Sequence, residues 1–164
     1  MPDIRIRNAR VDDMSAILAL NDAAVQYTSA MDALRLQELQ ALAGLNWVIT
    51  VDDAVAGFLL AMREGAGYAN ANYDFFAARY PVFLYVDRIV IAPEHAGLKL
   101  GTQVYKAVFA RARTQGVPTV TCEYNIEPPN EISRRFHDKF GFREIGTQWL
   151  DGGAKRVSLQ AAPV

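Results

Sequence analysis

The sequence predicts an α/β protein, and two neighbouring stretches in the middle of the chain carry most of that prediction. Residues 82–92 form a nearly continuous run of apolar and β-branched side chains, which is typical of a strand buried on both faces. A short loop with Gly97 and Gly101 follows, and apolar residues then recur at helical spacing over residues 104–112. The order is therefore strand, glycine-bearing turn and helix.

The first third of the chain predicts a strand, two helices and a β-hairpin. Alternating apolar and charged residues at positions 4–7 indicate a half-exposed strand, and helical spacing follows over residues 14–25 and 32–43. Two β-rich runs, residues 47–51 and 55–62, are separated by two aspartates and an alanine, as in a hairpin. We expect the two helices to be scaffold rather than site.

Residues 64–80 form a long aromatic segment without a clear period, and we expect an irregular loop there. A loop of this length inside a compact domain is often functional. Its aromatic side chains either wall a substrate pocket or cap the open edge of the core. These side chains are Tyr68, Tyr73, Phe75, Phe76 and Tyr80.

The last third of the chain predicts a strand, a short helix and a closing hairpin. Residues 117–125 read as the strand, and the helix begins near Asn130 after two prolines. Residues 142–149 and 154–159, joined by an Asp-Gly-Gly turn, form the hairpin. The helix is expected to bury Ile132, Phe136 and Phe140.

Length, composition and charge indicate one globular cytoplasmic domain. The chain has 164 residues, enough to bury a core and too few for two ordinary domains, so we expect a single domain over residues 1–164. The net charge of −1 leaves no basic field that would favour nucleic acid or an anionic membrane. The single cysteine, Cys122, suits a reducing compartment and reads as a buried hydrophobe rather than a nucleophile. No signal core or membrane-spanning run is present.

The glycine-bearing turn has two interpretations that its residues alone leave open. A helix start offers backbone N–H groups and the positive end of the helix dipole, and glycine lets an anion approach the main chain. These properties favour a phosphate-bearing ligand, but many α/β proteins use glycine only to turn tightly. The spacing of Gly97 and Gly101 fits neither the dinucleotide fingerprint nor a P-loop.

Two stretches together resemble the GNAT superfamily of N-acetyltransferases. The first, RIVIAPEHAGLKLGTQVY at residues 88–105, is similar to its acyl-CoA-binding motif of strand, proline, Arg-Gly-x-Gly-x-Gly/Ala and helix. The second, NEISRRFHDKFGF at residues 130–142, is similar to the later motif Asn-x-x-Ala-x-x-Leu-Tyr-x-x-x-Gly-Phe. The order of elements also agrees. The resemblance implies an α/β (α+β) fold with a mixed, mostly antiparallel central sheet flanked by helices, and an acyl-CoA cleft between the two central strands.

The resemblance also implies which residues bind acetyl-CoA, the co-substrate. The central strand would hold the pantetheine arm, the turn would wrap the pyrophosphate, and the later helix would line the CoA tail. The turn departs from the family pattern at two positions, with Ala96 in place of the usual arginine and Lys99 in place of the middle glycine. The residues assigned to these roles are Ile89, Val90, Ile91, Gly97, Leu98, Lys99, Leu100, Gly101, Thr102, Asn130, Ser133, Phe136 and His137.

His137 stands where the family commonly has a tyrosine that acts as general acid. Acetyl transfer needs a neutral amine, support for the oxyanion, here from an amide of residues 89–91, and protonation of the departing thiolate. Because a thiol of pKa about 8.5 leaves readily, a histidine of pKa about 6.5, or water, is a sufficient proton donor. The alternative is that His137 makes a structural hydrogen bond on its helix. His95 is expected to be solvated.

Three carboxylates are candidates for the base that deprotonates an amine whose pKa, in a lysine, is about 10.4. Glu123 comes first, because burial raises a carboxylate's pKa toward neutrality. Asp87 comes second, because strand alternation puts it on one face with the residues assigned to the pantetheine arm. Glu127 comes third. The structural alternatives are that Asp87 pairs with Arg88 or another arginine and that Glu127 lies in solvent.

The sequence thus predicts a cytoplasmic acetyltransferase that moves an acetyl group from acetyl-CoA to an amine by direct attack. The aromatic segment and the near-neutral charge favour a small-molecule or amino-acid-like acceptor. No metal is implied, because the two histidines and one cysteine are not spaced as ligands. The rival hypothesis is a non-catalytic acyl-CoA-binding or sensor domain of the same fold. A strand edge near the C-terminal hairpin would allow a homodimer.

Overall fold

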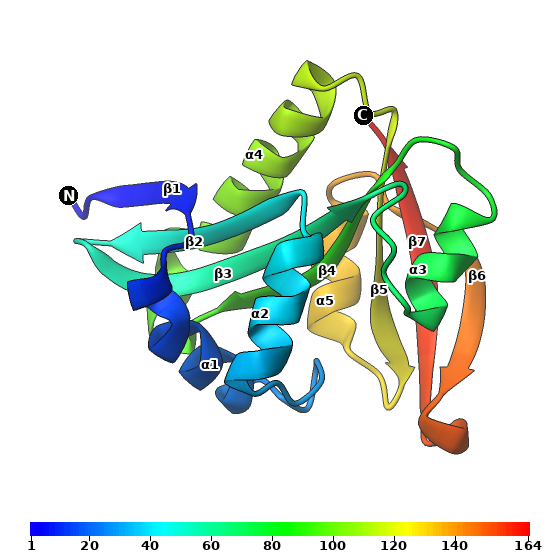
Figure 1. Cartoon of the computed structure of the whole chain (residues 1–164), viewed down its shortest axis with the longest axis horizontal. Helices are drawn as coiled ribbons and strands as arrows, with labels where there is room; N and C mark the ends of the chain where they lie inside the picture. The colour runs from blue at the N-terminus through cyan, green and yellow to red at the C-terminus, as the bar shows by residue number, and fades with distance from the viewer. The chain divides into compact units, whose positions relative to one another are not determined.

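Seven strands form one mixed sheet, in the order β1-β2-β3-β4-β5-β7-β6, in a computed structural model that describes all 164 residues (Figure 1). β4 and β5 pair in parallel, whereas β1–β2, β2–β3, β5–β7 and β6–β7 are antiparallel. The predicted mixed, mostly antiparallel sheet with flanking helices is confirmed. The strands are β1 (Ile4–Asn8), β2 (Leu45–Val51), β3 (Ala54–Arg63), β4 (Leu84–Ile91), β5 (Thr119–Glu127), β6 (Arg143–Leu150) and β7 (Lys155–Pro163). The α-helices are α1 (Met14–Ala23), α2 (Ala33–Leu42), α3 (Ala71–Ala77), α4 (Leu100–Thr114) and α5 (Glu131–Asp138), and the 3₁₀ turns are η1 (Val11–Asp13), η2 (Pro93–Leu98) and η3 (Asp151–Gly153).

The chain divides into two compact units. The first comprises Met1–Met62 and Val86–Ala110, and the second comprises Arg63–Tyr85 and Arg111–Val164. The turn before α4 belongs to the first unit, and α5 belongs to the second. The residues expected to bind and react are therefore distributed over both units.

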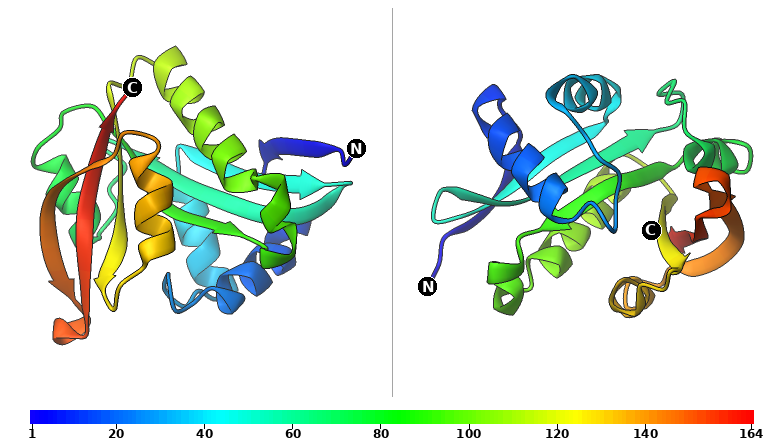
Figure 2. Two further views of the ribbon diagram at one scale, coloured as in Figure 1. Left: turned by 180° about the vertical axis from the view of Figure 1, so that it is seen from behind. Right: turned by 90° about the horizontal axis from the view of Figure 1, so that it is seen from below.

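In the first unit, α1 and α2 cover one face of β2 and β3, and α4 lies on the other face (Figure 2). Leu36 and Leu39 of α2 and Ile17 of α1 are almost completely buried, which explains the helical spacing of apolar residues in this part of the sequence. α2 begins at an N-cap, because the Asp32 carboxylate accepts a hydrogen bond from the Arg35 N–H at 2.8 Å.

The second unit is built on the antiparallel strands β5, β7 and β6. At the other edge of β5, the first two residues of β4 add in parallel, with Leu84 opposite Val120 and Tyr85 opposite Thr121. α5 packs against β5 (Figure 2). The predicted closing hairpin is confirmed by the pairing of β6 with β7.

The expectation of an irregular loop over residues 64–80 is wrong in its middle, where α3 forms. Asn70 begins this helix, and its side-chain oxygen accepts a hydrogen bond from the Tyr73 N–H at 3.0 Å. Seven residues are too short a helix to show a period of 3.6 in the sequence. Tyr68, Tyr73 and Phe76 are buried, so these aromatic side chains belong to the core.

The predicted buried face of α5 is also wrong. Ile132 is 84% exposed, and Phe136 and Phe140 are only partly covered. The buried residue of this helix is His137, which is 5% exposed. The helix is therefore rotated so that His137, rather than Ile132, faces the interior.

Candidate active site

The turn before α4 contains a lysine in the left-handed backbone region. Lys99 has φ 53° and ψ 42°, between the end of η2 at Leu98 and the start of α4 at Leu100. An L-residue in this region costs roughly 1–2 kcal/mol, whereas glycine adopts it freely. This backbone conformation gives a physical reason for the glycine that the family pattern has here. Lys99 accepts the strain and places an exposed ammonium side chain at the start of a helix.

The start of α4 is fixed by contacts of Gln103. Its backbone N–H donates to the Lys99 carbonyl at 3.2 Å, and its side-chain amide donates to the Leu98 carbonyl at 3.1 Å. The amides of Leu100, Gly101 and Thr102 fall in the first turn, where a helix does not use its own N–H groups. Gly97 is exposed, and a Cβ placed on it would meet no atom within 4 Å. The turn can thus present backbone donors and one cation to an anion.

On β4, side chains alternate between a buried face and a half-exposed face. Val90 belongs to the buried face, whereas Asp87, Ile89 and Ile91 share the other one, as the sequence predicts; the carboxylate of Asp87 is itself buried. β3 approaches this strand very closely at Gly57, where a Cβ would lie 2.8 Å from the Val90 carbonyl and 2.7 Å from Cδ1 of Ile91. A larger residue at position 57 would therefore push the end of β4 away from β3.

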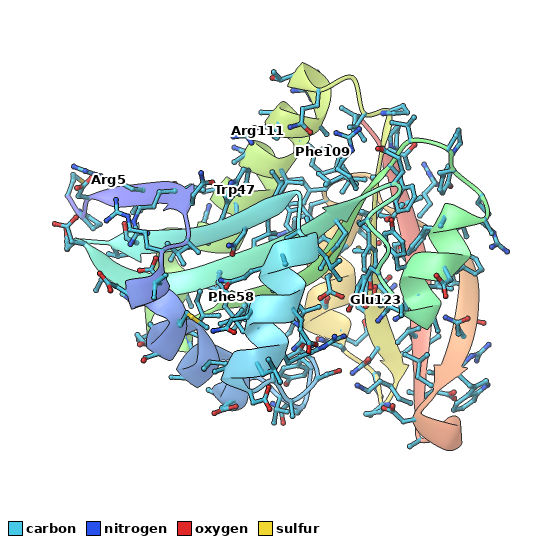
Figure 3. The ribbon with its side chains drawn as sticks, viewed as in Figure 1. Arg5, Trp47, Phe58, Phe109, Arg111 and Glu123 are labelled. Carbon is cyan, nitrogen blue, oxygen red and sulfur yellow. The ribbon has the colours of Figure 1, made fainter.

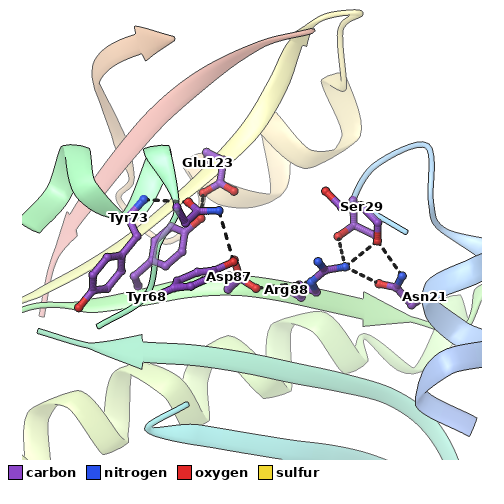
Figure 4. A network of polar contacts seen from close by, with 10 residues as sticks. Asn21, Ser29, Tyr68, Tyr73, Asp87, Arg88 and Glu123 are labelled. Atoms are coloured by element: carbon purple, nitrogen blue, oxygen red, sulfur yellow. Dashed lines mark hydrogen bonds and ion pairs between the residues drawn. The ribbon is translucent and has the colours of Figure 1, made fainter. Parts of the chain in front are cut away.

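Asp87 lies beside a buried arginine. Its Oδ2 is 3.5 Å from Nε of Arg88, and both side chains are less than a tenth exposed. Arg88 Nη1 donates to the Ser29 carbonyl at 2.6 Å and to Oδ1 of Asn21 at 3.0 Å, and the Asn21 amide donates to the same carbonyl at 2.8 Å (Figure 4). The structure therefore supports the ion-pair alternative for Asp87 that the sequence left open. Arg88 also ties the segment between α1 and α2 to β4.

Glu123 occupies a different environment on β5 (Figure 3). It is half-buried, between the buried side chains of Cys122 and Tyr124. The Tyr85 hydroxyl donates a hydrogen bond of 2.7 Å to its Oε2. Glu127, further along β5, is exposed and lies 3.9 Å from Nη1 of Arg156, as the solvent alternative predicts.

Asn130, the N-cap of α5, lies on one stripe with Ser133 and His137, and His137 contacts Tyr124 of β5. The Asn130 side-chain oxygen caps the helix by accepting from the Ser133 N–H at 3.2 Å. Nδ1 of His137 lies 2.7 Å from the Ser133 carbonyl, so this nitrogen carries the hydrogen and donates it. The Ser133 hydroxyl lies 3.2 Å from the same nitrogen.

The imidazole of His137 packs among aromatic rings. The ring centroids of Tyr124, Phe136 and Phe142 lie 5.3–5.5 Å away. Burial lowers the pKa of His137, and the hydrogen bond to the Ser133 carbonyl offsets only part of this effect. Burial likewise raises the pKa of the Tyr124 phenol. At neutral pH, both side chains are therefore uncharged.

One pocket of about 410 Å³ lies in the first unit and is lined by Asp22, Ala30, Met31, Asp32 and Arg35. Its wall includes the segment that Arg88 holds through Ser29. No three His, Cys, Asp or Glu side chains gather as metal ligands would. None of the helices has the length and apolar character needed to cross a membrane.

Sequence reasoning missed two residues, Tyr85 and Arg88. Both lie within the apolar run of β4, where a tyrosine and an arginine read as part of a buried strand. The partner of Tyr85 lies 38 residues later, and the carbonyl partner of Arg88 lies 59 residues earlier, so no local spacing reveals either contact. Only strand pairing and loop placement disclose them.

Comparison with known proteins gives a consistent result. The acetyltransferase (GNAT) family model matches residues 11–142. Ard1 from Thermoplasma volcanium superposes with a TM-score of 0.81 at 15% identity, over 98% of this chain and 97% of that one. The ribosomal-protein-S18-alanine N-acetyltransferase from Escherichia coli superposes with a TM-score of 0.74 at 14% identity, over 99% of this chain and 94% of that one. Arabidopsis thaliana Naa50, solved with the bisubstrate analogue CoA-Ac-MVNAL, superposes with a TM-score of 0.71 at 13% identity, over 96% of this chain and 97% of that one. None of the curated proteins is significantly similar to this chain in sequence.

Proposed function

Because the chain belongs to the acetyltransferase (GNAT) family, we propose that it transfers an acetyl group from acetyl-CoA to the amine of a small-molecule or amino-acid-like acceptor. The observation that carries this proposal is the family match itself, which includes the turn before α4, the strand of Glu123 and the whole of α5. An acyltransferase of this family needs an anion-binding turn and a means of deprotonating the amine. The chain offers residues for both.

Acetyl-CoA binding is assigned to residues of each unit. In the first unit, residues 97–102 receive the pyrophosphate, with the first amides of α4 as donors and Lys99 as the cation. Backbone groups of Ile89, Val90 and Ile91 hold the pantetheine arm. In the second unit, Asn130, Ser133, Phe136 and His137 line the remainder of the CoA tail.

Glu123 is the proposed general base. It accepts a proton from the acceptor ammonium, and the nitrogen lone pair then forms a bond to the thioester carbonyl carbon. The C–S bond breaks, and an amide of residues 89–91 stabilises the oxyanion on the way. The thiolate takes up one proton as it leaves, and the nitrogen gives up its second proton to water as the neutral amide forms. Asp87 is the second candidate, and its ion pair with Arg88 argues for a structural role.

The proton for the thiolate is assigned to His137 or to water. The buried, neutral imidazole with its Nδ1 hydrogen on the Ser133 carbonyl favours a packing role for His137. A thiol of pKa about 8.5 leaves without a strong acid, so water meets this requirement.

The acceptor class rests on two kinds of support. The chain has a net charge of −1, which gives no broad field for a highly charged partner. Two structural neighbours are named for, or solved with, acceptors built from amino acids: the alanine of ribosomal protein S18, and the peptide part of a bisubstrate analogue written CoA-Ac-MVNAL. An amino-acid-like amine is the chemistry that these acceptors share.

A second candidate is a non-catalytic acyl-CoA-binding or sensor domain. The observation that favours it is Lys99 in the left-handed region, together with Ala96, because both depart from the family's anion-binding turn.

The homodimer and the cytoplasmic location stay predictions. For a homodimer, the edge strand β6, with Ile145 and Trp149 exposed, is the strand to which a second copy would pair.

The test is calorimetric titration of acetyl-CoA into the protein, followed by a panel of amines with thiol release as the readout. Micromolar binding with release for some amines supports the enzyme and begins to define the acceptor. Binding without release across amino acids, peptides and polyamines favours the sensor candidate. Absence of binding contradicts both.

A further inference from the structure

Tyr85 is completely buried, yet it carries a hydroxyl whose hydrogen bond goes to a half-buried carboxylate. The exposed fraction of Tyr85 is 0%, and its hydroxyl lies 2.7 Å from Oε2 of Glu123. A buried phenol needs an acceptor, and a carboxylate is a stronger acceptor than a neutral group. A phenylalanine would fill the same apolar volume without this bond.

The ring of Tyr85 is held in place from several sides. Its centroid lies 5.7 Å from that of Phe76, 5.9 Å from that of Tyr73 and 6.5 Å from that of Tyr68. Its backbone pairs with Thr121, two residues before Glu123 on β5. The direction of the hydroxyl is therefore set by packing and not by the carboxylate alone.

Tyr73 provides an internal contrast within the same cluster. Its hydroxyl donates to the Arg63 carbonyl at 2.6 Å and accepts from the Ala66 N–H at 3.1 Å. Both partners are backbone groups of the segment before α3. The two phenols share an apolar environment, but only that of Tyr85 is directed at a titratable group.

We propose that Tyr85 is a positioning residue for Glu123, an inference that rests on the proposed role of Glu123 as general base. The hydrogen bond fixes Oε2 and therefore the plane of the carboxylate. It also favours the charged form of Glu123, which half-burial on β5 disfavours. The base is thus kept ionised and oriented before the amine arrives.

The residues of this unit beside Glu123 come from three strands and from the segment before α3. On β5 its neighbours are Cys122 and Tyr124, and on β7 the residue opposite is Leu159, which has no charge. Tyr85 itself comes from β4, and Tyr68, from the segment before α3, packs on Tyr85.

The first test is a double-mutant cycle on kcat/KM for acetyl transfer, with acetyl-CoA and a reactive amine from the panel. Tyr85→Phe alone should lower kcat/KM about tenfold or more, because hydrogen bonds to charged groups are of that strength. In the Glu123→Gln background, Tyr85→Phe should change kcat/KM less than twofold, because the charged partner is gone. Equal losses in both backgrounds would overturn the inference. Tyr73→Phe is the matched control, and it should lower the melting temperature without lowering kcat/KM.

The second test does not depend on turnover. Proton uptake by Glu123 can be followed by ¹³C-carboxyl NMR of glutamate-labelled protein, with the signal identified by its absence in Glu123→Gln. In Tyr85→Phe, the titration midpoint should rise by about one pH unit, and in Tyr73→Phe it should stay in place. An unchanged midpoint in Tyr85→Phe would overturn the inference. If Glu123→Gln keeps full activity while the midpoint moves as expected, the base assignment fails and the contact between Tyr85 and Glu123 stands.

Discussion

Asp87 and Glu123 are carboxylates on the neighbouring strands β4 and β5, and the structure gives them opposite kinds of partner. Asp87 lies 3.5 Å from a buried arginine, whose other contacts hold backbone and side-chain oxygens of the α1–α2 segment. Glu123 is half-buried and accepts from a phenol. An arginine stays charged throughout the physiological range, so a carboxylate beside it is held as an anion. A phenol also stabilises the anion through its hydrogen bond, but without the full positive charge of a guanidinium, so the carboxylate stays able to accept a proton, as a base must.

The largest effect on stability should come from replacing Arg88, the partner of Asp87. In Arg88→Met, Asp87 loses its buried cation, and the Ser29 carbonyl loses a donor. Breaking a buried pair in this way should lower the free energy of unfolding by about 3–5 kcal/mol, as measured by urea denaturation. Arg134→Met is the control, because the ion pair of Arg134 with Glu131 is half-exposed, and its loss should change the free energy little. A loss below 1 kcal/mol in Arg88→Met would remove the structural assignment of Asp87.

The close approach of β3 to β4 at Gly57 should be the next most sensitive feature to mutation. Gly57→Ala places a methyl group 2.8 Å from the Val90 carbonyl, which cannot move without shifting the strand that carries Asp87. Overpacking of this kind should lower the free energy of unfolding by about 1–3 kcal/mol. Gly97→Ala is the matched control, because its methyl group meets nothing within 4 Å, and its free energy of unfolding should stay near that of the wild type. Equal stability of both variants would contradict the close approach.

A pH titration extends the comparison to His137 in the second unit. Burial lowers the pKa of the folded imidazole below the value of about 6.5 expected in an unfolded chain. As pH falls below 6.5, the unfolded chain therefore takes up a proton first, so stability is full above this pH and decreases below it. The free energy of unfolding between pH 7.5 and 5 should fall more steeply for the wild type than for His137→Gln. Parallel curves would show that His137 is not a buried neutral group.

The smallest effect is expected at Lys99. Lys99→Gly removes the left-handed strain but makes the unfolded chain more flexible, so the free energy of unfolding should rise by no more than about 1 kcal/mol. The affinity for acetyl-CoA should fall several-fold in low salt, because a cation near the phosphates is lost. The control is Lys139→Ala, just after α5, which removes one positive charge away from the turn and should leave the affinity for acetyl-CoA unchanged. An unchanged affinity would remove Lys99 from the phosphate site.

The sequence allowed the main elements of the fold to be predicted, because their signals are local. The apolar run of β4, the helical stripe of α4 and the turn residues of the hairpins each lie within a dozen positions. The Asn130, Ser133 and His137 stripe was likewise readable, since its spacing follows from the helix itself. The contacts of His137 to the Ser133 carbonyl and to aromatic rings could not be predicted from the sequence.

The remaining features depend on partners that are distant in the sequence. Burial of α5 is decided by what β5 presents to it, so Ile132 was placed inside although it is exposed. The seven residues of α3 are too few to show a helical period. The Tyr85–Glu123 bond follows from the parallel pairing of β4 with β5, which no spacing encodes. The sequence already ranked Glu123 above Asp87, but the different partners of the two carboxylates became visible only in the structure.

The most direct measurement is acetyl transfer by Glu123→Gln beside Glu127→Gln, two changes of the same chemistry on one strand. Glu123→Gln should lower kcat/KM about 100-fold or more, as loss of a general base does, while the calorimetric affinity for acetyl-CoA stays that of the wild type. Glu127→Gln, which removes an exposed carboxylate, should stay within twofold of the wild type. Activity of Glu123→Gln within twofold of the wild type would contradict the assignment of Glu123 as the base.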